Sequence, residues 1–178
     1  MDTYKINIAG IERELVKNPV NDKLDIAAFI MFGDIEITEK SAEELLKICP
    51  EHDVVLTAEA KGIPLCYEMA RQGCRNYVIA RKGTKVYMGN PIEVSVNSIT
   101  TENDQKLYLG DNDVEFLKDK RVLIVDDVVS TGNSLEALEK LVACTGAKIV
   151  GKAAVLAEGD AIGRKDLIYL AELPLFFK

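Results

Sequence analysis

The sequence predicts an α/β fold with a doubly wound, mostly parallel sheet. The first observation is a set of short apolar runs rich in β-branched residues, at 53–56, 76–80, 122–125 and 147–156. Such runs are typical of strands buried on both faces of a sheet. The second is that helical patterns at 63–73 and 135–146 separate these runs. This alternation is typical of parallel sheets, whose ligands bind beyond the carboxyl ends of the strands.

Composition restricts the class of protein. The chain has 178 residues, enough for one domain with a sizeable core. Lys and Arg number 22 against 29 Asp and Glu, a net charge of −7, which argues against nucleic-acid partners because these need a basic surface. No apolar run reaches the roughly 18 residues of a membrane span, and we see no signal peptide. We therefore expect a single domain over 1–178, with no nucleic-acid or membrane partner.

The cysteines give no sign of a metal site. They are scattered, no C-x-x-C occurs, and His52 is the one histidine of the chain. Reduced thiols in a cytoplasmic protein are therefore expected, rather than a zinc site. The four are Cys49, Cys66, Cys74 and Cys144.

The first fifty residues have the weakest patterns. Residues 3–16 alternate enough for one or two strands, 18–22 indicate a turn, and 24–34 indicate a strand or a buried apolar segment. A Ser-x-x-Glu capping box then predicts a short helix over 41–49 that ends before Pro50. Its inward side chains would be Leu45, Leu46 and Ile48.

A strand–loop–helix unit begins at Asp53. Strand 53–56 leads into loop 57–62 and then into a helix with Pro64 in its first turn. Lys61 lies among small residues of the loop, so backbone N–H groups and a lysine could hold a phosphate there. Taken alone, the stretch fits a connecting loop with a solvated lysine better. Arg81-Lys82 follows the next strand and is either a second cationic loop or a solvated strand end.

The segment from 83 to 120 is polar and punctuated by glycine. It contains two alternating stretches, 92–96 and 105–109, which predict short strands joined by a turn at 102–104. Long insertions between core strands often act as lids. A surface β-ribbon used for packing or dimerisation is the alternative.

The most informative stretch is Arg121 to Ser134, RVLIVDDVVSTGNS. Asp126 and Asp127 follow the apolar run where such a strand would end. A small, polar turn comes next and opens a helix, whose free N–H groups and dipole favour a phosphate. Gly132 permits a tight turn. Hydroxyl donors are available from Ser130, Thr131 and Ser134.

The two carboxylates need a different ligand, because they repel phosphate. A vicinal diol, or water around a divalent cation, suits them. A phosphate beside a diol describes a ribose 5-phosphate. For Asp126 and Asp127 alone, acidic capping of a helix is an equally good interpretation.

VLIVDDVVSTGNS resembles the 5-phosphoribosyl-1-pyrophosphate (PRPP) binding motif of the type I phosphoribosyltransferases, over about thirteen residues. Upstream, Glu59 to Gly62 (EAKG) is similar to the E-A-x-G pyrophosphate loop of the adenine and xanthine members. The resemblance implies the fold of that family, with a flexible hairpin at about 83–118 and a small hood from about 1–40 and 171–178. It also implies a homodimer and transfer of the phosphoribosyl group of PRPP to a purine base, with Mg²⁺ as cofactor.

The resemblance assigns site residues by position. Asp126 and Asp127 would hold the ribose hydroxyls or metal-bound water, with Asp127 as a candidate proton acceptor. The 5-phosphate would be held by Val128, Val129, Ser130, Thr131, Gly132, Asn133 and Ser134. Pyrophosphate would lie against Glu59, Ala60, Lys61, Gly62, Arg81 and Lys82.

The resemblance also points to the base. Residues 31–35, MFGDI, resemble the F-R-D-I hood sequence of the adenine members, with Gly33 where arginine is usual. Met31, Gly33 and Leu173 would flank the base. Adenine, giving AMP, is the first choice, and xanthine, hypoxanthine or guanine are the alternatives. The hairpin stretch VNSITTEN lacks the glutamate–tyrosine pair of the adenine members. A non-catalytic PRPP-binding regulator is the remaining alternative, although such regulators usually carry a separate DNA-binding domain.

The C-terminal part completes the expected fold. Residues 167–170 predict the last strand. Phe176 and Phe177 are expected to pack against the N-terminal segment or a partner subunit.

Overall fold

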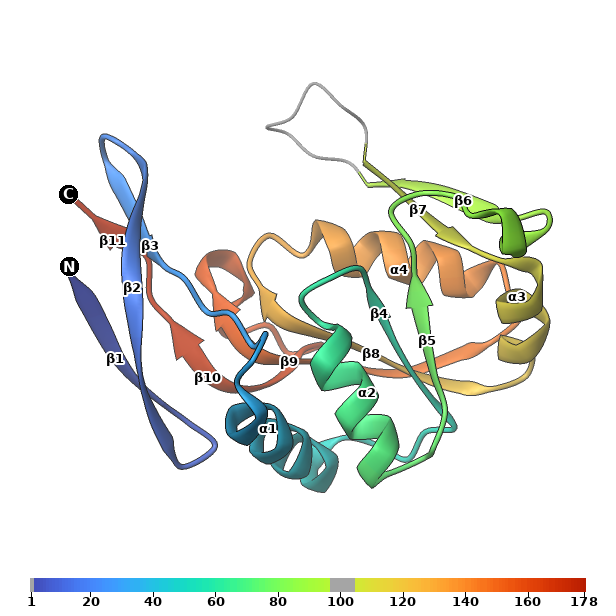
Figure 1. Ribbon diagram of the computed structural model, residues 1–178, viewed down its shortest axis with the longest axis horizontal. Helices are drawn as coiled ribbons and strands as arrows, with labels where there is room; N and C mark the ends of the chain where they lie inside the picture. The colour runs from blue at the N-terminus through green and yellow to red at the C-terminus, as the bar shows by residue number, and fades with distance from the viewer. Residues whose placement is uncertain (1, 97–104) are drawn as a thin grey trace.

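The computed structural model describes residues 2–96 and 105–178 (Figure 1). Its central sheet has five parallel strands in the order β10-β9-β8-β4-β5, which confirms the predicted α/β fold. The strands are β4 (Val54–Ala58), β5 (Tyr77–Ala80), β8 (Arg121–Val129), β9 (Lys148–Glu158) and β10 (Ile168–Leu173). Their order along the sheet reverses between β4 and β8, where doubly wound sheets bind ligands.

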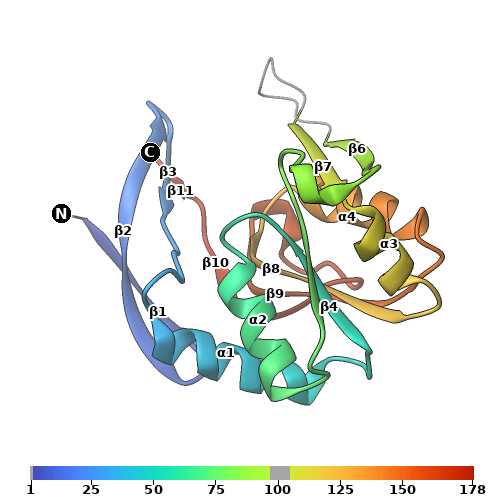
Figure 2. The ribbon, with the colours of Figure 1, turned by 45° about the vertical axis from the view of Figure 1, so that its right-hand side comes forward.

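Helices cover both faces of this sheet (Figures 1 and 2). On one face lie α1 (Ile35–Ile48) and α2 (Ile63–Gln72), and on the other lies α4 (Asn133–Ala143). The core accordingly forms two clusters, one on each face. Every residue of β4 is buried, as expected for a strand covered on both faces. No helix in the described parts of the chain is long and apolar enough to cross a bilayer.

A second sheet joins the two ends of the chain. It is antiparallel, in the order β1-β2-β3-β11, and lies at the left of Figure 1. Its strands are β1 (Thr3–Ile8), β2 (Ile11–Asn21), β3 (Leu24–Ala27) and β11 (Phe176–Phe177). The ring of Phe176 packs edge-on against Tyr4, with centroids 5.2 Å apart, which confirms its packing against the N-terminal segment. Phe177 is exposed.

The predicted turn at 18–22 is wrong. β2 continues to Asn21, and the turn is at Asp22 and Lys23. β1 pairs with β2 only as far as Val16, so Pro19 lies where β2 has a single neighbour and where its register with β3 shifts. Proline is tolerated at such irregular positions because no ladder hydrogen bond from its nitrogen is needed.

The predicted start of the first helix is also wrong. α1 begins at Ile35, and Asp34 caps it by accepting from the Ile37 N–H at 3.1 Å. Asp34 is held in place by Arg13 of β2, whose Nε and Nη2 donate to its carboxylate at 2.7 and 3.0 Å. Ser41 therefore lies within the helix and is buried, whereas Ile48 is exposed rather than inward.

The segment from 83 to 120 contains the two predicted strands, β6 (Ile92–Val96) and β7 (Gln105–Leu109), paired antiparallel. The turn predicted at 102–104 lies outside the described residues. Two short helices were not foreseen, η1 (Val86–Met88) and α3 (Asp111–Leu117). Leu107 and Leu109 are buried in the cluster that includes α4, so β7 belongs to the core of the domain.

Candidate active site

Three segments meet at the carboxyl edge of the central sheet. They are the loop after β4, the end of β5 and the stretch from Asp126 to Ser134. Together they line a cavity of about 330 Å³, and a neighbouring cavity of about 150 Å³ lies against residues 128–135. The two cavities share Asp126, Val128 and Ser134. The structure thus brings together the acidic pair and the two predicted phosphate loops.

The acidic pair lies within β8 and not after its end, contrary to the sequence prediction. β8 continues to Val129 because β9 offers register partners as far as Ala157. β4, on the other side, pairs only as far as Ile124, which leaves this edge of β8 open toward the loop after β4. Successive strand side chains point to opposite faces. Asp126 and Asp127 therefore flank the strand at the point where the cavity opens.

The two carboxylates disfavour each other's charge. Asp127 is 2 % exposed, and its Oδ2 has no hydrogen-bond partner among the described residues. Lys61 Nζ lies 3.5 Å from that oxygen. Asp126 Oδ1 accepts from the Asp127 N–H at 2.9 Å. Burial, and then the charge of Asp127, raise the pKa of Asp126 well above its ordinary value. A cation or a pair of hydroxyl donors at this place would offset both the burial of the carboxylates and the repulsion between them.

Glu59 connects the loop after β4 to the end of β5. Its carboxylate accepts from Arg81 Nε at 2.6 Å and from the Lys82 N–H at 2.6 Å. Burial alone would raise the pKa of Glu59, but these two donors outweigh burial and lower it. Arg81 also donates to the Tyr87 hydroxyl at 2.7 Å. Glu59 and Arg81 thus position each other, whereas Lys61 and Lys82 border the cavity.

Gly62 lies closely against the acidic pair. A Cβ at this position would collide with the Thr57 hydroxyl and would lie 3.0 Å from Asp126 Oδ1. The φ of Gly62 is −74°, so backbone strain is not the reason for glycine here. The reason is the close approach of the loop to β8, which brings Lys61 within reach of Asp127.

We expect Gly62→Ala to lower both stability and ligand affinity, because the added methyl must displace Thr57 or Asp126. Overpacking of this kind costs about 1–3 kcal/mol. Urea unfolding of Gly62→Ala measures the loss, and Gly83→Ala is the matched control, since a Cβ there meets nothing within 4 Å. Adding Thr57→Ala to Gly62→Ala should restore part of the stability. Equal stability of the two glycine variants would contradict the close packing.

The predicted 5-phosphate loop has the geometry of an anion site. Gly132 has a φ of +85° and precedes α4, whose first residues line the cavity against residues 128–135. The N–H groups of a first helical turn lack partners within the helix and can bind an anion. A Cβ on Gly132 would collide with Arg164 Nη1. Arg164 is held by Asp166, with Nε and Nη2 donating at 3.0 and 2.7 Å. The loop is therefore confined between its own helix and an arginine.

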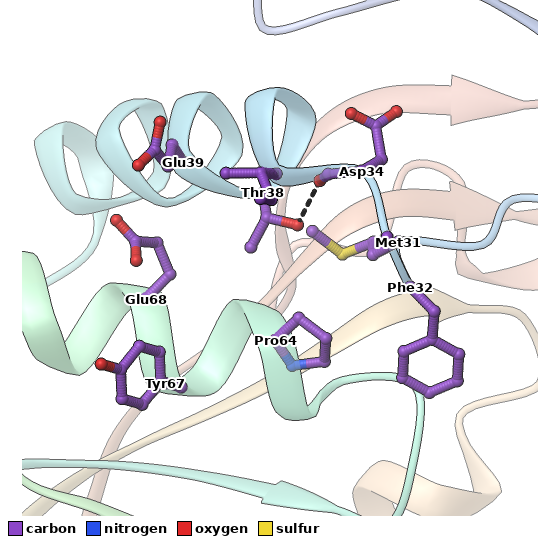
Figure 3. A pocket seen from close by; sticks show the side chains of 10 residues that line it. Met31, Phe32, Asp34, Thr38, Glu39, Pro64, Tyr67 and Glu68 are labelled. Atoms are coloured by element: carbon purple, nitrogen blue, oxygen red, sulfur yellow. Dashed lines mark hydrogen bonds between the residues drawn. The ribbon is translucent and has the colours of Figure 1, made fainter.

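The candidate base-binding residues are only partly brought together. Met31 and Gly33 line a cavity of about 320 Å³ between the start of α1 and α2, with Phe32, Pro64 and Tyr67 on its other sides (Figure 3). Asp34, Glu39 and Glu68 also line this cavity, whereas Asp126 and Asp127 do not. Leu173 shares a core cluster with Met31 but is 1 % exposed and does not border this cavity. Its side chain has little surface to offer a base.

Sequence reasoning missed two charged residues near the site, Arg164 and Glu158. Glu158 is the last residue of β9 and is partly buried. Its pKa is raised by burial, and the Ser130 hydroxyl and the charge of Lys61 offset only part of this rise. One signal could have found it: Glu158 directly follows the apolar run of β9, at the edge where the other candidates lie.

Two carboxylates fit a hydrated divalent cation. Within residues 2–96 and 105–178, no group of three or more His, Cys, Asp or Glu is placed to hold a metal ion. Asp126 and Asp127 would therefore supply few of the ligands. This suits Mg²⁺, which keeps several waters and takes oxygens from substrate phosphates. Asp127 Oδ2, which has no hydrogen-bond partner among the described residues, is an oxygen acceptor of the right kind.

Comparison with known proteins gives consistent matches. Residues 31–170 match the family model of the phosphoribosyl transferase domain. The hypoxanthine/guanine phosphoribosyltransferase of Methanococcus voltae is 41% identical over 143 residues, 80% of this chain and 70% of that protein. The adenine phosphoribosyltransferase of Rhodococcus jostii is 32% identical over 138 residues, 77% of this chain and 75% of that protein. Among solved structures, adenine phosphoribosyltransferase from Thermoanaerobacter pseudethanolicus superimposes with a TM-score of 0.74 at 21% identity, covering 89% of this chain and 95% of that one.

Proposed function

The chain belongs to the phosphoribosyltransferase family, and from that premise we propose that it transfers the 5-phosphoribosyl group of PRPP to a purine base. A ring nitrogen of the base forms a bond to C1 of the ribose, the bond from C1 to the pyrophosphate oxygen breaks, and the base loses its N–H proton. The observation that carries the proposal is the position of the acidic pair, between two loops that can each bind an anion. This arrangement matches a ribose with a phosphate at each end.

In this proposal the residues of the site bind different parts of PRPP. Asp126 and Asp127 hold the ribose hydroxyls, and Ser130 to Ser134, with Val128 and Val129, surround the 5-phosphate. Lys61 and Lys82 face the pyrophosphate, together with the N–H groups of Ala60 and Gly62. In the transition state the ribose ring becomes cation-like and the departing pyrophosphate gains negative charge. Hydrogen-bond donors already in place around the pyrophosphate therefore lower the barrier.

Mg²⁺ is the proposed cofactor. Asp126 and Asp127 would hold it through water, and it would supply neutralisation of the charge on the departing pyrophosphate. Lys61 supports this from the protein side, because its ammonium group lies 3.5 Å from Asp127 Oδ2 and its half-exposed side chain lines the cavity. The raised pKa of Asp126 is expected to fall when a cation is near.

We propose adenine as the preferred base, with AMP as the product, in purine salvage. Support comes from the MFGDI stretch, in which Met31 and Gly33 border a cavity whose lining includes the apolar side chains of Phe32, Pro64 and Tyr67. The similar proteins carry names for both adenine and hypoxanthine/guanine, so the oxopurines are the alternative. We also propose a single domain over 1–178, a cytoplasmic location and a homodimer, for which sedimentation velocity is the test.

A base panel tests the function directly. Adenine, hypoxanthine, guanine, xanthine, uracil and orotate are each incubated with PRPP, Mg²⁺ and the protein, and the nucleotide is followed by chromatography. We expect product with a purine, above all adenine, and none with uracil, with orotate or with excess chelator. Absence of product from every base, with PRPP still bound, would instead favour a non-catalytic PRPP sensor.

A further inference from the structure

Glu158 is a charged group of the carboxyl edge to which the proposed reaction gives no task. It ends β9, and its register partner on β10 is Leu173. Register partners in a parallel sheet direct their side chains to the same face. Leu173 packs in the core cluster that contains Met31, so Glu158 points to the face where the candidate base segment lies. Ala157, the preceding residue, packs in the cluster of the opposite face, which agrees with this orientation.

The surroundings of Glu158 place it between the two anion loops. Burial raises the pKa of Glu158, and the Ser130 hydroxyl in one loop and the charge of Lys61 in the other offset only part of this rise. Gly159, the next residue, lies close to both Leu175 and Ser130, since a Cβ there would be 3.3 Å from Leu175 Cδ1 and 4.0 Å from Ser130 Oγ. Glu158 is therefore at the site and not on the outer surface of the domain.

The carboxylate oxygens of Glu158 can accept hydrogen bonds from a ligand. Two other glutamates, the partly buried Glu59 at the sheet edge and the buried Glu68 of α2, are each paired with an arginine. Glu158 forms no ion pair within the described parts of the chain. A partly buried carboxylate that forms no ion pair is costly unless hydrogen-bond donors reach it. A bound ligand that presents N–H groups would satisfy it.

Resting on the proposed function, we infer that Glu158 recognises the base and that its carboxylate selects purines with an exocyclic amino group. Phosphate and pyrophosphate are excluded by charge, and the ribose hydroxyls already face Asp126 and Asp127. The base is the remaining part of the substrates with N–H donors. The amino group of adenine at C6 or of guanine at C2 can donate to a carboxylate, whereas a carbonyl at the same position repels it.

The test compares bases that differ in one group. Values of kcat/KM are measured for adenine, guanine and hypoxanthine with the full chain and with Glu158→Gln. A glutamine can donate as well as accept, so it tolerates a carbonyl. We expect the wild-type protein to favour an aminopurine over hypoxanthine and Glu158→Gln to reduce this ratio by about tenfold or more. Adenine against hypoxanthine tests the amino group at C6, and guanine against hypoxanthine tests that at C2.

Asp160→Asn is the matched control, since it removes one negative charge from an exposed side chain two residues away and should leave the ratio unchanged. Affinities of AMP, GMP and IMP, measured by calorimetry, give the same comparison without turnover. Should no base react, the proposed function fails, and the nucleotide affinities still decide the role of Glu158. An unchanged ratio in both measurements would overturn the inference. A rise in the KM for PRPP alone would also overturn it, because Glu158 would then act on Ser130 and the phosphate loop. Absence of any nucleotide binding would overturn it as well.

Discussion

Turnover is expected to disappear when Asp126 and Asp127 are both replaced by asparagine, while the fold remains intact. The amides keep the shape of the side chains but offer weaker acceptors to hydroxyls and to metal-bound water. We expect kcat/KM to fall by about three orders of magnitude or more, the scale of loss when an electrostatic element of a site is removed. Steady-state release of pyrophosphate measures the loss, and circular dichroism checks the fold.

The same double variant makes a prediction about stability. The pKa of Asp126 is raised in the folded protein, so the folded state binds this proton more tightly than the unfolded state. Stability therefore falls as the pH rises from the ordinary aspartate range through the raised pKa, and the full cost remains above it. Asparagine removes the cost. Urea unfolding at pH 5 and pH 9 should show a gain for the variant that is larger at pH 9.

A suitable control replaces two exposed aspartates, Asp119 and Asp160, by asparagine. This variant changes the net charge equally and should keep wild-type turnover. Near-normal turnover in the Asp126/Asp127 variant would remove the acidic pair from the proposed mechanism. A variant less stable than the wild type at pH 9 would show that the pair stabilises the folded state, contrary to the argument from burial.

Two adjacent carboxylates inside a buried strand lower the stability of the fold, and a role in binding a ligand would explain their position. β8 is otherwise apolar from Val122 to Val125, and apolar residues would suit the strand better at the next two positions. Strain and unfavourable charge concentrate at functional sites because ligands satisfy them. The pair is therefore stronger support for a site than for a helix cap.

The sequence predicted the central sheet well because parallel strands are buried on both faces and appear as apolar runs. The start of the first helix was harder to predict. A Ser-x-x-Glu pattern at Ser41 and the Asp34 cap are comparable local signals for the start of α1. Asp34 prevails because Arg13, from a strand 21 residues earlier, pairs with it. Local patterns carry no information about such a partner.

The residues of the candidate site also fall into two groups, those in continuous motifs and those brought together only by the fold. Asp126 to Ser134 and the loop at Glu59 to Gly62 are continuous segments, so their motifs could be recognised in the sequence. The resemblance assigns Leu173 to the base as the leucine near the C-terminus, yet the register of β10 buries it and directs Glu158 of β9 toward the same face. Arg164 approaches Gly132 only through the folded loop after β9. Such pairings depend on strand register and loop path, which composition and spacing do not determine.

The phosphate loop gives the second large effect, for Gly132→Ala. An alanine there has to adopt a φ of +85° and also collides with Arg164. The backbone cost is about 1–2 kcal/mol. The collision displaces the loop whose N–H groups would bind the 5-phosphate, so we expect the KM for PRPP to rise by roughly tenfold to a hundredfold. Steady-state kinetics with varied PRPP and a saturating base measures this effect.

Gly163→Ala separates the two causes. Gly163 has a φ of +78°, close to that of Gly132, but a Cβ there meets nothing within 4 Å. Both alanine variants should therefore lose similar stability from backbone strain, and only Gly132→Ala should weaken PRPP. Removing the obstacle with Arg164→Ala in the Gly132→Ala protein should recover part of the affinity, provided that Arg164 acts by confining the loop. If Gly132→Ala and Gly163→Ala raise the KM equally, strain alone accounts for the effect. If the Arg164→Ala change weakens PRPP further, the guanidinium itself contacts the phosphate, and the arginine belongs among the binding residues.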